Sequence, residues 1–413
     1  ALTLGGTVNL PGKLTWAAGD MYGTGTFQGA GELVIEGNVN RYVNGTTSIT
    51  LSTTTRWKSG AVRCSFCTGN ITNTGTLYVD AGAGNTATLG SVALTNTGTI
   101  NIQSGTFAMH TGTSTGTITG SPGTFLQTSN YTLGNSTLSG EVTFNAGALT
   151  LGGTVNLPGK LTWAAGDMYG TGTFQGAGEL VIEGTSTKFF NSTTNITNAA
   201  TLRLNAGTVN CSFCVATLNN TGNLIADPGT GNTVAINGTN ITNSGSITLL
   251  SGTLNLGRGL TQTAGTLSLN GGNLGGGNTV TLNGGTLSGA GSISASVVNN
   301  ATINVGGIPG TTTITGTYTQ GAGGTLNVQL GGTTAGTEFD RLAVSGAASL
   351  NGTLNLSLIN SFSPVIGNSF SILTSGSRTG TFAAVNGTDI GGGRILQAAY
   401  AASGVTINTI AAP

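Results

Sequence analysis

Apolar and polar residues alternate in short runs along almost the whole chain. Examples are Leu2-Thr3-Leu4, Thr7-Val8-Asn9-Leu10 and Glu32-Leu33-Val34-Ile35-Glu36, and glycine-containing turns separate such runs. Successive side chains of a strand point to opposite faces, so the pattern predicts strands with one buried face. No stretch has a helical period, and glycine is too frequent to sustain helices. The pattern therefore predicts an all-β protein.

The chain repeats itself on two scales. Residues 1–37 recur without a change as residues 148–184, so the larger repeat unit is the stretch 1–147. On a finer scale, Asn73-Thr74-Gly75 returns shortly afterwards as Asn96-Thr97-Gly98. Repeats of this kind are typical of solenoids, in which each unit contacts only its neighbours.

Together these periods predict a right-handed parallel β-helix. Seven coils in the unit 1–147 would average about 21 residues each, within the range of solenoid repeats. Each coil would bring two or three short strands that pair with their equivalents one coil away, at about 4.8 Å. Right-handed winding is the default for parallel connections. Glycine and asparagine are expected at corners that need positive φ or a tight bend.

The pattern of apolar and polar residues changes near Gly306-Gly307-Ile308-Pro309-Gly310, beyond which the alternating runs lengthen. We therefore expect a first solenoid unit over 1–147, a second unit with following coils over 148–305, and a distinct C-terminal β segment over 306–413. This last segment would cap or link the solenoid, since a bare last coil exposes open strand edges.

Charge is scarce and balanced. Charged residues are 6% of the chain, with 12 basic and 12 acidic side chains. Nucleic acid and anionic membranes both need a basic face, so neither is expected as a partner. No apolar run is long enough to suggest a membrane-spanning helix. Because no signal peptide begins at Ala1, the sequence reads as a mature chain, and its cysteines and Asn-x-Thr sites fit an extracellular location.

Two Cys-x-x-Cys pairs carry the strongest local chemistry. They are Cys64 with Cys67 and Cys211 with Cys214. Four such cysteines suggest zinc if the pairs meet in space, but in a solenoid they lie about seven coils apart. We therefore predict a local disulfide in each pair, closing a tight corner. Free thiols, intermolecular cross-links and metal remain as alternatives, and no metal or cofactor is predicted.

No catalytic residue emerges from the motifs. Gly112-Thr113-Ser114-Thr115-Gly116 matches the nucleophile elbow, which works only on a strand-to-helix turn with histidine and acid beside it. The acids Asp20, Glu32 and Glu36 return as Asp167, Glu179 and Glu183, but duplication of a unit copies surface charges as readily as sites. We therefore expect no enzyme, with a polysaccharide lyase or hydrolase as a remote alternative.

Several aromatic residues repeat with the larger unit. Trp16, Tyr22 and Phe27 return as Trp163, Tyr169 and Phe174. Core or corner packing is one interpretation, and a surface platform for sugar rings is the other.

The C-terminal part resembles the segment that closes bacterial autotransporter passengers and related large β-helical surface adhesins. The resemblance is carried by Gly316-Thr317-Tyr318-Thr319-Gln320, Gly324-Thr325-Leu326-Asn327-Val328, Glu338-Phe339-Asp340-Arg341-Leu342-Ala343-Val344-Ser345-Gly346 and Gly352-Thr353-Leu354-Asn355-Leu356. The preceding part of the chain resembles the Gly/Thr/Asn-rich repeats of that family. The resemblance implies secretion, a right-handed β-helix and a role in adhesion or surface structure. The family's membrane barrel has no counterpart in this sequence, which implies a released passenger or a free secreted relative.

These observations predict a secreted structural protein on a bacterial cell surface. It would be a β-solenoid subunit of an extracellular filament, surface layer or adhesin stalk, and head-to-tail self-association would build open filaments. The alternating residues 404–410, with Val405, Ile407 and Ile410, are a candidate strand for pairing with the next subunit. The alternative function is a carbohydrate- or cell-binding adhesin module whose partner is surface polysaccharide.

Overall fold

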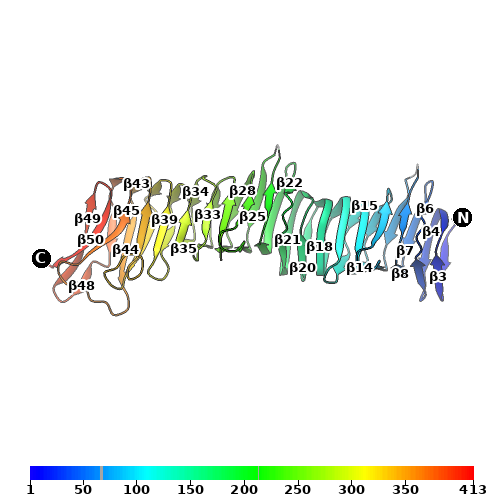
Figure 1. The fold of residues 1–413 in the computed structure, drawn as a ribbon, viewed down its shortest axis with the longest axis horizontal. Coiled ribbons are helices and arrows are strands. Elements are labelled where there is room, and N and C mark those ends of the chain that lie inside the picture. Colours follow the sequence, from blue (N-terminus) through cyan, green and yellow to red (C-terminus); the bar gives the residue numbers. More distant parts are fainter. Residues whose placement is uncertain (66–67, 213) are drawn as a thin grey trace. The chain divides into compact units, whose positions relative to one another are not determined.

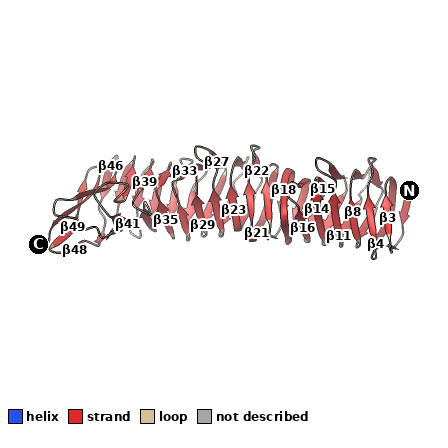
Figure 2. Cartoon of the chain, turned by 60° about the horizontal axis from the view of Figure 1, so that its bottom comes forward, coloured by secondary structure: helices blue, strands red, loops and turns tan. Residues whose placement is uncertain are grey.

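Every regular element in the described part of the chain is a β-strand, as Figure 2 shows. The computed structural model describes residues 1–65, 68–212 and 214–413. Within the strands, side chains alternate between the interior and the surface: β11 (Thr76–Asp80) buries Leu77 and Val79 and turns Tyr78 outward. The strands are parallel and stacked, forming a β-solenoid (Figure 1), so the predicted all-β solenoid class is confirmed.

The chain forms two compact units, each built by the same rule. The first comprises residues 1–202 and 209–216, and the second comprises residues 203–208 and 217–413. Strands β23 (Asn195–Leu204), β24 (Thr208–Asn210) and β25 (Ala216–Asn220) lie where the chain passes between them. The predicted boundary at residue 147 falls inside a single strand, β18 (Ser136–Leu151), so the sequence repeat does not mark a structural division.

Three parallel ladders make up the first unit, and long strands pass through a corner from one ladder to the next. The first ladder joins β2 (Thr7–Asn9), β4 (Gly19–Gln28), β7 (Ser48–Leu51), β10 (Asn70–Asn73), β13 (Ala93–Asn96), β15 (Thr106–Ser114), β17 (Phe125–Leu133), β18 and β21 (Asp167–Ile182). The second joins β3 (Lys13–Trp16), β5 (Glu32–Ile35), β8 (Thr54–Trp57), β11, β14 (Thr99–Ser104), β16 (Thr117–Gly120) and β18. The third joins β1 (Leu2–Leu4), β4, β6 (Arg41–Val43), β9 (Ala61–Arg63), β12 (Thr86–Gly90) and β15. Strands β19 (Thr154–Asn156), β20 (Lys160–Trp163) and β22 (Lys188–Phe190) complete the unit.

Coil length in this unit is not constant. Along the second ladder, positions 54, 76, 99, 117 and 137 lie opposite one another, so the number of residues in a coil changes from one turn to the next. The coils keep their pairing because the turns between strands absorb the difference in length.

The two identical stretches form the same strand pairings. Lys13 pairs with Glu32 in the first copy, and Lys160 pairs with Glu179 in the second. Each copy therefore forms the same coils in the same register. The copies differ in what lies before them. In the second copy β17 and β18 cover the leading strands, whereas β1, β2 and β3 pair on one side only within the described residues.

The second unit also has three parallel ladders. Ladder 1 joins β26 (Asn223–Ala226), β29 (Ser246–Leu249), β32 (Thr266–Ser268), β35 (Thr286–Gly289), β38 (Thr302–Val305), β41 (Thr325–Leu330), β44 (Thr353–Leu358) and β47 (Ala384–Asn386). Ladder 2 joins β27 (Thr233–Ile236), β30 (Thr253–Leu256), β33 (Asn273–Gly275), β36 (Gly291–Ile293), β39 (Thr311–Ile314), β42 (Arg341–Val344) and β45 (Ser369–Thr374). Ladder 3 joins β28 (Thr239–Asn243), β31 (Leu260–Gln262), β34 (Val280–Leu282), β37 (Val297–Asn299), β40 (Tyr318–Gln320), β43 (Ala347–Leu350) and β46 (Ser377–Gly380).

The change in strand pairing lies further along the chain than the change in the sequence pattern does. The loop at 306–310 merely joins β38 to β39, and the parallel ladders continue beyond it. Apart from an isolated antiparallel bridge between Leu330 and Phe339, the antiparallel pairs lie at the end of the described chain. Strand β50 (Gly404–Ala411) lies between β45 and β49 (Arg394–Ala401), and β48 (Asp389–Gly391) pairs with β49. Strand β50 therefore covers the outer edge of β45, which is the role expected of a cap.

The repeated Asn-Thr-Gly corners work differently from the prediction. Asn73 and Asn96 end buried strands, and neither has positive φ. Their side chains form a stack inside the solenoid, in which each amide bonds to the next coil. Gly98 also lacks positive φ, but a Cβ there would lie 2.2 Å from the carbonyl oxygen of Gly75. Close approach of neighbouring coils, and not backbone φ, thus explains glycine at this corner.

Two buried cations lie at equivalent places in the two copies of the larger repeat. The Arg41 guanidinium donates to the carbonyl oxygens of Trp16 at 2.7 Å and Gly37 at 3.1 Å. The Lys188 ammonium donates to the carbonyl oxygen of Ser186 at 3.0 Å. Desolvation lowers the pKa of both groups. Backbone carbonyls at a corner therefore replace the water that each charge loses.

Candidate functional site

A row of uncharged polar side chains lies along the surface-facing side of ladder 1 in the second unit. Paired positions in successive strands place Ser268, Ser288, Asn304, Asn327, Asn355 and Asn386 next to one another. They occupy the surface-facing positions of strands whose alternate residues, such as Leu326 and Leu354, are fully buried. The hydrophobic core thus fixes which face of the ladder carries the polar groups.

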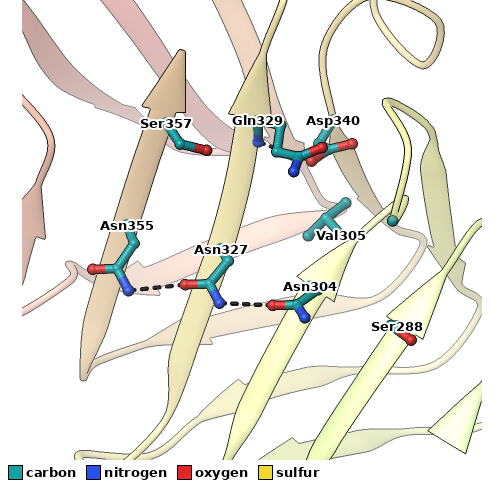
Figure 3. A pocket seen from close by; sticks show the side chains of 9 residues that line it. Ser288, Asn304, Val305, Asn327, Gln329, Asp340, Asn355 and Ser357 are labelled. Atoms are coloured by element: carbon teal, nitrogen blue, oxygen red, sulfur yellow. Dashed lines mark hydrogen bonds between the residues drawn. The ribbon is translucent and has the colours of Figure 1, made fainter. Parts of the chain in front are cut away.

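Hydrogen bonds join the four asparagines of this row, here called the amide row (Asn304, Asn327, Asn355 and Asn386), and Figure 3 shows the first three of them. The side-chain nitrogen of Asn327 donates to Oδ1 of Asn304 at 2.7 Å, and that of Asn355 donates to Oδ1 of Asn327 at 2.8 Å. Asn386 donates to Oδ1 of Asn355 at 2.8 Å. The bonds all run in one direction, so the amides share one orientation across four coils.

A groove of about 530 Å³ lies over this part of ladder 1. Asn304, Asn327 and Asn355 line one part of it, and Gln329, Ser357 and Asp340 line another (Figure 3). A row of threonines, Thr302, Thr325 and Thr353, precedes the amide row by two residues on the same strands, so it lies on the same outward side. The outward side of these strands therefore carries a threonine row beside the amides that line the groove.

Asp340 is the one ionisable residue among the described residues of this lining, and it is 1% exposed. Its Oδ1 accepts a hydrogen bond from the backbone N–H of Gly310 at 3.0 Å, and its Oδ2 accepts one from the N–H of Gln329 at 2.8 Å. Burial raises the pKa of Asp340 to about 6, and the two backbone donors oppose that rise. The carboxylate thus joins the 306–310 loop to β41 and is held by the protein itself.

The arrangement is suited to binding and offers no nucleophile with a base. Among the described residues, no three His, Cys, Asp or Glu side chains gather closely enough to hold a metal ion. The groove presents amides and hydroxyls, which can recognise a ligand by hydrogen bonds.

The nucleophile-elbow match is explained by the corner repeat. Ser114 ends β15 at the place that Asn73 and Asn96 take in earlier coils. Its hydroxyl is buried and accepts a hydrogen bond from the side chain of Asn96 at 3.0 Å. The motif lies on a strand and a strand-to-strand corner, so the exposed serine that an elbow requires is not present here.

The duplicated acids lie in local surface contacts. Glu32 forms an ion pair with Arg56 at 2.9 Å, and Glu36 forms one with Lys58 at 3.5 Å. Asp167 accepts a hydrogen bond from Asn191 at 2.9 Å, and partial burial raises its pKa. These contacts agree with the expected role as structural surface charges.

The structure joins Cys211 and Cys214 by a disulfide, which is the pairing predicted from the sequence. Both cysteines lie outside the strands, between β24 and β25, and Ser212 and Cys214 lie at bends of the backbone. Cys67 lies outside the described residues, and the predicted Cys64–Cys67 bond therefore cannot be described.

The predicted assembly strand is wrong. Val405 and Ile407 are buried in β50, and Ile410 is partly buried in the same strand. Both edges of β50 already carry hydrogen bonds, to β45 on one side and to β49 on the other. The alternation that suggested a free strand is instead produced by packing against the body of the second unit.

Most of the repeated aromatic residues are core residues. Trp16, Trp163, Phe27 and Phe174 are buried, and each tryptophan N–H donates to the backbone carbonyl of a nearby glycine. Tyr22, at 37% exposed, is the repeated aromatic that most clearly reaches the surface. The interpretation as a platform for sugar rings is therefore wrong for the tryptophans and phenylalanines.

Sequence reasoning missed the amide row. The spacing between its successive members widens from 23 to 28 to 31 positions, because loops of different length interrupt the coils. A fixed period therefore does not reveal them. A local pattern could have revealed the row, since Asn304, Asn327 and Asn355 each follow a threonine and an apolar residue.

No protein-family model matches the chain, and no curated protein matches it in sequence. Among the described residues there is also no helix long and apolar enough to cross a membrane.

Proposed function

We propose that this chain is a secreted bacterial structural protein, a β-solenoid subunit of an extracellular filament, surface layer or adhesin stalk. Backbone ladders that run from coil to coil, together with stacked apolar side chains and buried amides, make each unit a stiff scaffold. The resemblance to autotransporter passengers supports a place on the cell surface. The Cys211–Cys214 disulfide supports an oxidising compartment.

The observation that carries the proposal is the contrast between the two identical stretches. Leu149 is 0% exposed beneath the preceding coil, whereas Leu2, its counterpart, is 43% exposed. A cavity of about 180 Å³ at the bare edge is lined by Leu2, Leu14 and Trp16, whose counterparts in the second copy are all buried. The covered second copy therefore shows that this stretch packs against a further parallel coil where one is present.

End-to-end stacking of subunits would supply such a coil from a second copy of the chain. A head-to-tail contact of this kind is heterologous and generates open filaments. The low charge of the chain reduces repulsion between stacked copies.

Negative-stain microscopy of the purified chain tests the proposal. We expect filaments, and we expect Leu14→Lys to abolish them, because stacking would bury an unpaired charge at a position whose counterpart, Leu161, is fully buried. Thr95→Lys, on the outer surface of β13, is the control and should leave filaments intact. Single particles of the wild-type chain over a range of concentrations would contradict assembly through this edge.

A further inference from the structure

The amide row has a regularity that the scaffold does not need. The interior of the second unit is already stabilised by its own buried stack, in which Asn220 donates to Asn243 at 2.7 Å and Asn243 donates to Gln262 at 3.2 Å. The amide row lies on the outward side of ladder 1, along the groove, and none of its four asparagines is fully buried. Its aligned side chains therefore point to a ligand.

The hydrogen-bonding capacity of the row can be counted. A side-chain amide has two N–H donors and an oxygen with two acceptor sites. Asn327 and Asn355 each use one donor and one acceptor within the row. Each therefore still presents one donor and one acceptor to the groove. A sugar hydroxyl likewise donates one hydrogen bond and accepts others, so it matches such an amide.

The charge of the groove selects the kind of saccharide. No lysine or arginine is among the described residues that line it, so nothing there balances a carboxylate, sulfate or phosphate. Both oxygens of Asp340 are already bonded to backbone N–H groups, and the side chain is buried. An acidic polymer would meet this carboxylate with no counter-charge, whereas a neutral one would not.

We propose that the groove over β38, β41 and β44 binds a neutral polysaccharide. The chain of sugars lies across the strands and follows the amide row from Asn304 towards Asn386. Neighbouring strands are about 4.8 Å apart, so each coil offers one amide to successive parts of the polymer. Hydroxyls of Thr302, Thr325 and Thr353 flank the row. Because the ladder holds the amides in one orientation, little side-chain freedom is lost on binding. This site is independent of the proposed role in filaments.

The test compares binding of neutral and acidic polysaccharides by affinity electrophoresis, with soluble β-glucan and galactomannan against polygalacturonate. The variant is Asn327→Ser with Asn355→Ser. Serine fits this row, because Ser268 and Ser288 occupy it in earlier coils. Loss of about two hydrogen bonds predicts roughly tenfold weaker binding or more. The matched control is Asn101→Ser, an outward position on β14 of the first unit, which should bind as the wild type does.

Binding of at least one neutral polymer that the double variant loses, while its thermal unfolding matches that of the Asn101→Ser control, supports the proposal. No binding of a neutral polymer by the wild-type chain would overturn it. Equal binding by wild type and double variant, or binding of polygalacturonate alone, would overturn it as well. If the double variant unfolds early, Asn327→Ser alone is measured in the same assay, with about a fivefold loss expected.

Discussion

The side-chain nitrogen of Asn73 donates a hydrogen bond to Oδ1 of Asn96, 2.8 Å away, inside the first unit. Both residues are fully buried. Asn96 in turn donates to Ser114 at 3.0 Å and to the carbonyl oxygen of Thr117 at 3.2 Å. A polar stack thus runs along a corner of an otherwise apolar interior, and each amide bonds to a coil that follows it. Buried polar groups of this kind stabilise a fold only while they stay bonded.

Replacing Asn96 by alanine should therefore destabilise the chain. The substitution removes the acceptor at Asn96 and leaves Ser114 without its donor, and unbonded buried groups cost about 1–3 kcal/mol. Guanidinium unfolding followed by circular dichroism measures the loss. Thr95→Ala, the adjacent position on the outer face of β13, should change stability by less than about 0.5 kcal/mol. Equal effects of the two substitutions would show that the stack adds no stability.

Glycine at the corner should be replaceable only where coils do not approach closely. Gly98→Ala would place a Cβ 2.2 Å from the carbonyl oxygen of Gly75, so neighbouring coils must separate, at a cost of about 1–3 kcal/mol. Gly12→Ala meets no atom within 4 Å and should be neutral or slightly stabilising. Thermal unfolding of both variants provides the comparison. An unchanged melting temperature for Gly98→Ala would contradict the close approach of the coils.

Identical residues in the two copies should contribute differently to the free energy of unfolding. Leu149→Ala removes a fully buried side chain and should cost about 2–5 kcal/mol. Leu2→Ala removes a side chain that is 43% exposed, so it should cost much less. Chemical denaturation of the two variants under conditions that keep the chain dispersed measures the difference. Equal losses would mean that the leading edge of the first copy is covered in solution.

Asp340 should make stability depend on mild acid. Its folded-state pKa of about 6 is raised above the ordinary value of 3.8, so the folded chain binds a proton more readily than the unfolded chain. Its contribution to stability should therefore rise as pH falls from about 6 to about 4. At about 1.4 kcal/mol per pKa unit, the change is at most about 3 kcal/mol.

Comparison with Asp340→Asn isolates this effect. Asparagine carries no charge to desolvate, so it removes the titration, and its single acceptor oxygen leaves one of the two backbone N–H groups without a partner at every pH. The free energy of unfolding of the wild type, relative to the variant, should increase between pH 6 and pH 4. A difference that stays constant over that interval would show that Asp340 has an ordinary pKa.

Particular residues show how far the sequence could be read. Alternation in the run Glu32-Leu33-Val34-Ile35-Glu36 predicted a strand, found as β5 with Leu33 and Ile35 buried, and the return of the Asn73 triplet at Asn96 predicted stacked coils. Of the two reasons expected for asparagine at those corners, positive φ was wrong, since Asn73 and Asn96 lack it and their side chains bond inside the core. Alternation at Val405 was real, but it could not show that both edges of β50 were already paired.

The sequence by itself determined the class of fold, because strict alternation broken by glycine turns leaves stacked strands as the way to bury one face. It also determined that the two copies form the same strand pairings, since identical chains have identical local preferences. Only the tertiary structure decided which residues meet across coils. Register depends on loop length, and loops between 304 and 386 vary, so the alignment of Asn304, Asn327, Asn355 and Asn386 exists only once the coils are stacked.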